Sequence, residues 1–275
     1  MSLIADGLIY STVRISVKTS NSEKIGTGFI YKYEENGKFW HFVITNRHVV
    51  ENAQSGEITF HKGKSIEGKN LLVDKEIFNL KFSSRSFYCS TDPSIDIAIW
   101  NISRIFDENS DKMYMITVGN KIIPENEEIN SKISKIDDII FIGYPIGIWD
   151  TKNYIPIVRK GITSTPYHYD FEGKPIFLID ASVFPGSSGS PVFVYRQGVD
   201  LDETTENRIG EKILFLGILS SRLEITAKGI VKLIDIPSTL EAYVNIKQPI
   251  NVGVVIKDKA IKEIIKQFFI FAEKI

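Results

Sequence analysis

Short apolar runs, either alternating with polar residues or fully apolar, recur along most of the chain. Residues 12–19 place valine or isoleucine at every second position, which is typical of a strand with one buried face. Residues 26–46 contain two aromatic-rich runs joined around Asn36-Gly37, which predicts a hairpin with an Asn-Gly turn. Other candidate strands lie at residues 57–63, 81–89, 95–102, 139–145, 155–163, 175–183, 191–197, 212–221 and 229–236. So many short strands with almost no helix between them predict an all-β fold of barrels or a sandwich.

Two segments depart from this pattern. Residues 103–136 are polar, acidic in the middle and weakly periodic, and we expect them to form a linker that crosses between two halves of the protein. Residues 256–275 space isoleucine and phenylalanine near the helical period, with lysine and glutamate elsewhere, which predicts an amphipathic C-terminal helix. Because one apolar face is enough to dock a helix, we expect docking on a barrel in preference to membrane or partner binding.

The overall composition narrows the classes of partner. The chain has 275 residues, of which 43% are hydrophobic and 24% charged, as is typical of a globular protein. A formal net charge of −1 provides no overall attraction to nucleic acid or to an anionic membrane. No apolar run reaches the roughly 18 residues that a membrane-spanning helix needs. We therefore expect neither nucleic acid nor membrane as a partner.

The cysteine and histidine content predicts no cofactor. Cys89 is the single cysteine, so neither an internal disulfide nor a thiolate metal site is expected. The four histidines, at positions 41, 48, 61 and 168, lack the spacing of metal ligands. The first residues have no basic region, and Asp6 and Gly7 interrupt their apolar residues, unlike a signal peptide. These features favour a reduced, cytoplasmic setting with no metal or other cofactor.

Three stretches combine residue types that carry nucleophilic catalysis. His48 lies just past an apolar strand, Asp96 opens another, and Ser188 lies within Gly186–Pro191, a loop with more small residues than a turn requires. Taken singly, such a histidine or aspartate has ordinary structural roles. A serine hydroxyl becomes a good nucleophile only when a base accepts its proton, and histidine can accept and return it. By contrast, Gly26-Thr27-Gly28 is only a fragment of a dinucleotide-binding motif and predicts a turn in a strand.

In the order His, Asp, Ser, these stretches resemble the chymotrypsin-fold (trypsin-like) serine proteases, of the bacterial trypsin-like peptidase type. The resemblance rests on Thr45–His48, Asp96–Ala98 and Gly186–Pro191. It continues in Gly217–Ser220, which is similar to the family's strand lining the primary specificity pocket. It covers residues 25–235 of the chain.

The resemblance implies two six-stranded antiparallel β-barrels with the active site in the cleft between them, followed by the C-terminal helix. Residues 1–118 would form the N-terminal barrel, which carries His48 and Asp96 and includes the start of the crossing linker. Residues 119–275 would form the C-terminal barrel, which carries Ser188 and the helix.

The resemblance also implies a serine endopeptidase that hydrolyses a protein or peptide substrate through an acyl-enzyme. His48 would be the base, Asp96 would hold the His48 tautomer, and Ser188 would be the nucleophile. The backbone N–H groups of Gly186 and Ser188 would form the oxyanion hole, which needs unusual dihedrals that glycine permits. Two alternatives stay open: a catalytically silent binding or regulatory module on the same fold, and a structural β-domain with chance motifs. The sequence carries no signal for an oligomeric state.

Two positions of the serine loop differ from the family pattern. Ser187 stands where secreted relatives have an aspartate that pairs with a newly cleaved N-terminus. A newly cleaved N-terminus would therefore find no acidic partner here. We expect an enzyme that is active as synthesised or that is activated in another way. Ser190 replaces the second glycine, which is an exchange of one small residue for another.

The resemblance places Ser182 at the floor of the primary specificity pocket, where its neutral side chain cannot balance a buried cation. Leu219 stands where glutamate-specific relatives have a histidine, and would form an apolar wall. Ser220 is similar to the serine whose hydroxyl supports the aspartate and whose carbonyl meets the substrate backbone. Arg222 occupies a place where active relatives usually have glycine, so it would narrow the pocket mouth or attract an acidic substrate residue. We expect cleavage after small to medium apolar residues.

Overall fold

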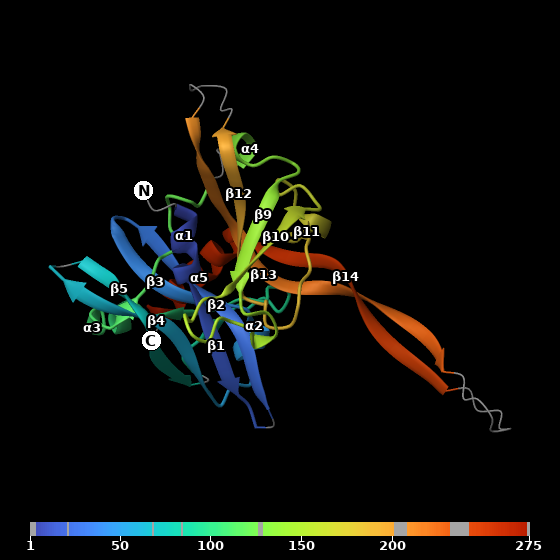
Figure 1. The fold of residues 1–275 in the computed structure, drawn as a ribbon, viewed down its shortest axis with the longest axis horizontal. Coiled ribbons are helices and arrows are strands. Elements are labelled where there is room, and N and C mark those ends of the chain that lie inside the picture. The colour runs from blue at the N-terminus through green and yellow to red at the C-terminus, as the bar shows by residue number, and fades with distance from the viewer. Residues whose placement is uncertain are drawn as a thin grey trace.

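The computed structural model describes residues 4–20, 22–67, 69–83, 85–125, 129–200, 208–231 and 242–273. The fold is mostly β, and its strands form two separate sheets, one in each half of the chain (Figure 1). The elements of the first half are α1 (Ile4–Leu8), η1 (Ile9–Ser11), β1 (Thr12–Lys18), β2 (Glu23–Glu35), β3 (Lys38–Thr45), α2 (Arg47–Val50), β4 (Ser55–Ile66), β5 (Lys69–Ser83), β6 (Tyr88–Cys89), β7 (Ala98–Asn101), α3 (Ser103–Glu108) and β8 (Met113–Tyr114).

The second half begins after the segment that joins the two sheets. Its elements are α4 (Ile129–Lys132), β9 (Asp138–Gly143), η2 (Pro145–Gly147), β10 (Ile157–Thr163), η3 (Phe171–Gly173), β11 (Ile176–Asp180), β12 (Pro191–Asp200), β13 (Arg208–Val231), β14 (Ala242–Lys257) and α5 (Asp258–Ala272). None of the helices in the described ranges has both the length and the apolar character needed to cross a membrane.

The first sheet is built from the alternating and aromatic strands expected from the sequence. Its strand order is β5-β4-β1-β2-β3-β7-β6, and β8 pairs with β4. The predicted hairpin is confirmed, because β2 pairs with β3 up to Glu35 and Lys38. Asn36 and Gly37 between them have φ angles of 51° and 73°, as the tight Asn-Gly turn requires. The expected turn at residues 26–28 is wrong, since these residues lie inside β2.

The expectation of two six-stranded barrels is confirmed for the second half only. There β10-β11-β14-β13-β12-β9 form a closed antiparallel barrel. Over the described residues the first half instead forms an eight-stranded sheet, with β5 and β6 at its two ends. Closure would require these end strands to pair. Among the described strands, however, β6 pairs with β7 alone and β5 with β4 alone.

Two strands extend beyond the sequence expectation. The apolar pattern missed β14, because polar residues and Pro249 interrupt it between residues 242 and 251. It also missed most of β5, of which only the end falls within the expected strand at 81–89. The strand expected at 229–236 begins as the end of β13, and its residues 232–236 lie outside the described residues.

The segment expected as a crossing linker is partly structured. It begins with α3, where the Asn101 side chain accepts a hydrogen bond from the backbone N–H of Ser103 at 3.0 Å. It then adds β8 to β4 and pairs Val118 with Tyr31. The segment therefore follows the first sheet for much of its length before it reaches the second half.

The expected C-terminal helix is confirmed as α5, and it joins the two halves. Ile261, Ile264 and Ile265 on α5 are buried. They belong to one core cluster with side chains of the first sheet, such as Phe42, and of the barrel, such as Phe215. Because this cluster is shared, α5 helps to keep the two sheets, and the residues that they carry, in one relative position.

Candidate active site

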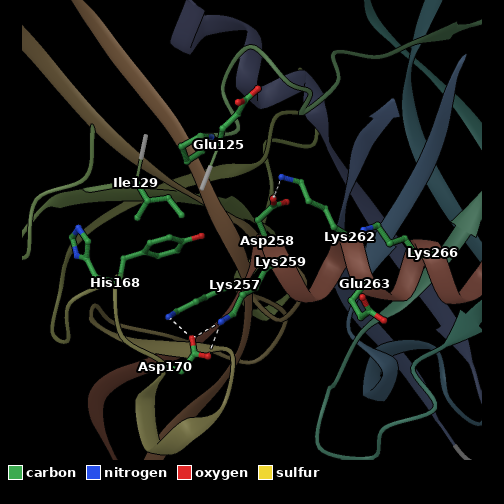
Figure 2. A pocket seen from close by; sticks show the side chains of 12 residues that line it. Glu125, Ile129, His168, Asp170, Lys257, Asp258, Lys259, Lys262, Glu263 and Lys266 are labelled. Carbon is green, nitrogen blue, oxygen red and sulfur yellow. Dashed lines mark hydrogen bonds and ion pairs between the residues drawn. The ribbon is translucent and has the colours of Figure 1, made fainter. Parts of the chain in front are cut away.

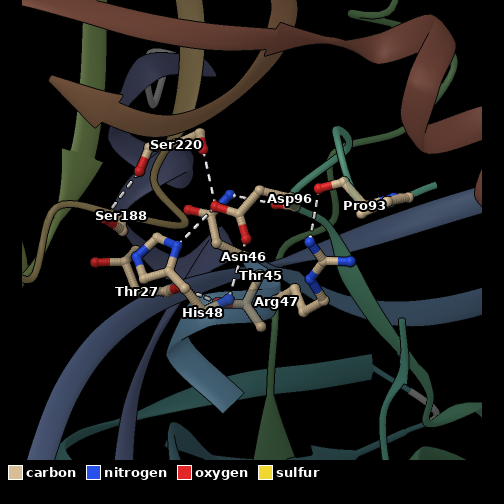
Figure 3. A network of polar contacts seen from close by, with 9 residues as sticks. All are labelled: Thr27, Thr45, Asn46, Arg47, His48, Pro93, Asp96, Ser188 and Ser220. Carbon is tan, nitrogen blue, oxygen red and sulfur yellow. Dashed lines mark hydrogen bonds and ion pairs between the residues drawn. The ribbon is translucent and has the colours of Figure 1, made fainter. Parts of the chain in front are cut away.

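His48 lies on α2, immediately after β3, and its neighbours tie this turn to the loop that carries Asp96. The Asn46 side chain donates a hydrogen bond to the Asp96 carbonyl oxygen at 2.7 Å. The Arg47 guanidinium donates one to the Pro93 carbonyl oxygen at 2.8 Å. On the other side of the turn, Val49 and Val50 are buried. Figure 3 shows Asn46 and Arg47 bonded to the loop that carries Asp96, which holds the turn with His48 beside Asp96.

Asp96 uses both carboxylate oxygens to hold His48. The Nδ1 atom of His48 lies 2.6 Å from Oδ2, and the backbone N–H of His48 donates to Oδ1 at 3.0 Å. Burial alone would raise the pKa of Asp96, but the hydrogen bonds and charge of His48, with a hydrogen bond from Ser220, hold that pKa below its ordinary value. An ionised carboxylate so close to Nδ1 requires a proton on that nitrogen, and neutral His48 then has Nε2 free to act as a base.

Ser220 connects Asp96 with Ser188. Its hydroxyl donates to Asp96 Oδ2 at 2.9 Å, and its carbonyl oxygen accepts a hydrogen bond from the Ser188 hydroxyl at 3.1 Å. Figure 3 shows the resulting network, in which the Ser188 hydroxyl is directed at Ser220 and the His48 ring at Asp96. The structure therefore brings together His48, Asp96, Ser188 and Ser220, with the serine hydroxyl bonded to Ser220 in place of His48.

The loop that carries Ser188 has a backbone that only glycine accommodates at two positions. Gly186 and Gly189 have φ angles of 88° and 93°, a region that residues with a Cβ rarely adopt. A Cβ on Gly189 would also overlap the carbonyl oxygen of Thr27. The backbone N–H groups of Ser187, Gly189 and Ser190 donate to protein carbonyls. Within the described residues those of Gly186 and Ser188 have no such acceptor, which leaves both available to an incoming oxygen.

Thr27 supports this loop, and the sequence analysis missed it. Its hydroxyl donates to the Gly186 carbonyl oxygen at 2.8 Å and accepts from the Tyr144 backbone N–H at 3.0 Å. Its backbone N–H donates to the Ser188 carbonyl oxygen at 3.0 Å. A strand of the first sheet thus holds the serine loop of the barrel. The signal was the pair of glycines around Thr27, because a Cβ on either would overlap side chains of β1 or α2.

The two unusual serines of the loop are both buried. Ser187 is 1% exposed and Ser190 is fully buried, and neither hydroxyl has a hydrogen-bond partner among the described residues. The position that is acidic in secreted relatives therefore lies inside the protein, as a neutral side chain. On the outside, the loop is held by the Ile146 backbone N–H, which donates to the Pro185 carbonyl oxygen at 2.6 Å.

The residues expected to form the specificity pocket have different surroundings. Ser182 is half-buried just after β11. Leu219 is fully buried among the core residues of the barrel, so it can support a pocket only from beneath. Arg222 lies on β13 opposite Gly253 of β14, and its side chain is outside the described residues. Among the described residues no three histidine, cysteine or acidic side chains group as metal ligands would.

A cavity of about 600 Å³ lies at the start of α5, and none of His48, Asp96, Ser188 and Ser220 lines it (Figure 2). Three of the lysines that line it form ion pairs. Lys257 and Lys259 lie 2.7 Å and 2.6 Å from Asp170, and Lys262 lies 2.9 Å from Asp258. We assign these pairs to the packing of α5.

The chain is similar in sequence to known proteases. Residues 26–201 match the family model of the trypsin-like peptidase domain. A protein from Staphylococcus aureus (strain USA300) described as serine protease HtrA-like is 27% identical over an alignment 214 residues long, which covers 70% of this chain and 23% of that protein. The chain thus spans about a quarter of the length of this relative, and the same values hold for its counterpart in strain NCTC 8325.

Solved structures of proteases also match the chain. An HtrA-type protease with a tripeptide is 14% identical with a TM-score of 0.49, over 94% of this chain and 60% of that one. An inactivated protease paralogue of the scabies mite is 16% identical with a TM-score of 0.45, over 94% and 96% of the two chains.

Proposed function

The chain belongs to the trypsin-like peptidase domain family, and from this premise we propose that it is a serine endopeptidase with Ser188, His48 and Asp96 as its catalytic residues. The observation that carries the proposal is the continuous network from His48 through Asp96 and Ser220 to Ser188. Its parts come from both sheets and meet at one place. Packing alone does not explain why a histidine, an aspartate and two serines should converge there.

The chemistry begins with the Ser188 hydroxyl. A rotation about its χ1 angle frees the hydroxyl from the Ser220 carbonyl and directs it to Nε2 of His48. His48 accepts the proton as the serine oxygen attacks the carbonyl carbon of the peptide bond, and Asp96 stabilises the imidazolium. His48 then gives the proton to the departing amine, which leaves an acyl-enzyme. A water molecule, deprotonated by the same nitrogen, hydrolyses the ester and restores Ser188.

The backbone N–H groups of Gly186 and Ser188 are proposed to bind the negative oxygen of the tetrahedral intermediate. Both lack a protein acceptor among the described residues, and Thr27 holds the carbonyl oxygens of the same two residues, Gly186 and Ser188. Loss of one such donor typically costs about 3 kcal/mol of transition-state stabilisation.

The primary specificity is proposed to be for small to medium apolar residues. Ser182 provides no charge, and Leu219 supports the site from within the apolar barrel core. Neighbouring side-chain sizes should be poorly distinguished, because each methylene is worth only about 1–3 kcal/mol. Profiling with a peptide library tests this assignment, and dominant cleavage after Lys, Arg or Glu would contradict it without affecting the catalytic residues.

A reduced, cytoplasmic setting is proposed because the sequence contains a single cysteine. Cys89 is half-buried, and burial raises the pKa of its thiol. A thiol of this kind is a packing residue and not a reactive one.

The second candidate function is a catalytically silent binding module on the same fold. One observation favours it: the Ser188 hydroxyl is bonded to Ser220 and not to His48. A fluorophosphonate probe separates the two candidates. We expect covalent labelling of the natural chain, no labelling of Ser188→Ala and His48→Ala, and full labelling of Ser187→Ala as the matched control. A folded natural chain that does not react, or one that reacts through Ser187, would overturn the endopeptidase proposal.

A further inference from the structure

The cavity at the start of α5 is lined by three segments that lie far apart in the sequence. One is α5 itself from Asp258 to Lys266, the second is the β10–β11 loop at residues 167–170, and the third contributes Pro124, Glu125 and Ile129 from the segment that leads from the first sheet to the barrel. Figure 2 shows side chains from all three around one space. At about 600 Å³, this space falls within the usual range of small-molecule sites, about 300–1,000 Å³.

Lysine ammonium groups give one side of the cavity an excess of positive charge. Lys257 and Lys259 both pair with the single carboxylate of Asp170, at 2.7 Å and 2.6 Å. Two cations against one anion leave one positive charge without a counterpart. Lys259 is exposed and donates to both oxygens of Asp170. Since an ammonium group has three N–H donors, Lys259 can bind a further anion without releasing Asp170.

Further along α5, two more lysines line the cavity. Lys262 pairs with Asp258 at 2.9 Å, and Lys266 has no ion pair among the described residues. Asp258 offers little negative charge to a ligand, because it is buried and hydrogen-bonded or ion-paired at both carboxylate oxygens. The other two acids, Glu125 and Glu263, are exposed, and solvent and salt screen their charge. Lys262 and Lys266 therefore add cationic donors to the lining.

Tyr167 places a buried donor without an acceptor on the cavity wall. It is 6% exposed and lines the cavity, and its hydroxyl has no hydrogen-bond partner among the described residues. Burial, together with the charges of Asp258 and Asp170, raises the pKa of this hydroxyl, so it keeps its proton and can donate it. Nδ1 of His168 is likewise buried without a described partner. Because a buried hydroxyl normally has a partner, Tyr167 points to an acceptor that a ligand supplies.

We propose that this cavity binds a small molecule that carries a phosphate group, with the phosphate held by the Tyr167 hydroxyl and the ammonium groups of Lys259 and Lys262. The cationic side chains of the lining are all lysines, which bind phosphate as point charges, whereas two-point recognition of a carboxylate uses the planar arginine. In addition, α5 has no side-chain cap at Lys257, so the N–H groups of its first turn add positive potential.

The size of the cavity calls for more than a phosphate ion. Pro124, Ile129 and the ring of Tyr167 supply apolar surface, which suits an uncharged ring or chain attached to the phosphate. None of the proposed catalytic residues lines the cavity. The proposal therefore goes beyond the endopeptidase function and does not depend on it.

The first test is isothermal titration calorimetry of the natural chain at low ionic strength. Phenyl phosphate and AMP are the probes, inorganic phosphate lacks the uncharged body, and benzoate and adenosine lack the phosphate. We expect Kd for at least one of the two esters to be at least about tenfold lower than for the other three compounds, because one hydrogen bond to a charged group is worth about that factor. No binding of either ester, or equally tight binding of benzoate or inorganic phosphate, would overturn the proposal.

The second test locates the bound ester. Tyr167→Phe removes only a hydroxyl without a described partner, and Lys259→Gln leaves Asp170 paired with its other lysine, so both variants should keep the circular dichroism of the natural chain. We expect each to raise Kd at least about tenfold. The matched controls lie outside the cavity: Tyr114→Phe, and Lys160→Gln at a lysine that is also exposed and paired with an acid. Both should leave Kd unchanged. An unchanged Kd in either cavity variant would contradict the proposal.

A third measurement tests the other place where a phosphate could bind, the free N–H groups of Gly186 and Ser188. Ser188→Asp places a carboxylate beside these groups and would repel an anion there. We expect this variant to bind the ester with the Kd of the natural chain. Loss of binding in Ser188→Asp would place the phosphate at the proposed active site and overturn the assignment to the α5 cavity. None of these measurements requires hydrolysis, so they stand or fall separately from the endopeptidase function.

Discussion

Among single residues, Asp96 couples the chemistry of the site to pH. Its pKa is held below the ordinary value by His48 and Ser220, so the folded protein binds this proton less tightly than the unfolded chain does. The stability that Asp96 contributes is therefore fully present above the unfolded value of about 3.9, and it is lost as the pH falls through the lower folded value.

The substitution Asp96→Asn removes the ionisable carboxyl group and so tests this pH dependence. Urea unfolding of both chains between pH 3 and pH 7 should give a stability advantage of the natural chain that is constant above about pH 5 and shrinks below about pH 4. The turnover of the variant should fall about 10⁴-fold, because the amide no longer holds the productive His48 tautomer. An advantage that grows as the pH falls would contradict this account of Asp96.

Ser187 makes a second prediction at this scale. Its hydroxyl is buried without a described partner, so Ser187→Ala should leave the free energy of unfolding unchanged or raise it, with activity kept. Ser187→Asp should destabilise the protein by about 3–5 kcal/mol, because it buries an unpaired charge. Ser190→Ala, at the other buried serine of the loop, is the matched control. A stable and more active Ser187→Asp variant would contradict this prediction, because it would show that a cationic group of the protein can pair with an acid at this position.

At the scale of elements, the contact between β2 and the serine loop depends on one hydroxyl. Thr27→Val should leave the Gly186 carbonyl and the Tyr144 N–H without their partner, and the loop should lose its alignment. Misplacement of catalytic groups by about 1 Å costs about a hundredfold in rate, so we expect kcat to fall by that factor while KM changes little. Thr27→Ser keeps the hydroxyl and should retain most of the activity. Equal kcat values for the two variants would show that the Thr27 hydroxyl does not align the serine loop.

The elements also show which parts of the structure local pattern can predict. The β2–β3 hairpin and α5 follow from short-range signals, the Asn-Gly turn and the helical spacing of apolar residues. β14 does not, because residues 242–251 are only partly apolar and pair with the outer part of β13, beyond its pairing with β12. Whether a sheet closes into a barrel depends on pairing between strands far apart in sequence, and the local apolar pattern therefore did not show that the first sheet stays open.

The candidate site was predictable only in part. The residue types of His48, Asp96 and Ser188 were visible as motifs, and their convergence was expected from a family resemblance. Thr27 escaped notice because a threonine between two glycines has the composition of a turn. The direction of the Ser188 hydroxyl is a choice between side-chain rotamers, for which the sequence contains no signal.

For the whole molecule, the shared core under α5 should make the two halves unfold together. Ile264 is 1% exposed in a cluster that includes both sheets. Ile264→Ala should cost about 2–5 kcal/mol, and unfolding followed by circular dichroism should coincide with loss of fluorophosphonate labelling, in the variant as in the natural chain. Ile270→Ala, at an exposed position of the same helix, should cost far less. Two separate transitions would show that the halves are independent.

The place of β14 in the barrel determines when the proposed active site can form during synthesis. β14 lies between β11 and β13 and closes the barrel, yet it comes later in the chain than the loop that carries Ser188. A chain still emerging from the ribosome therefore contains His48, Asp96 and Ser188 before the barrel that carries Ser188 can close. On the proposed function, neighbouring nascent chains, which are unfolded and extended, would be exposed to hydrolysis only after β14 has been synthesised.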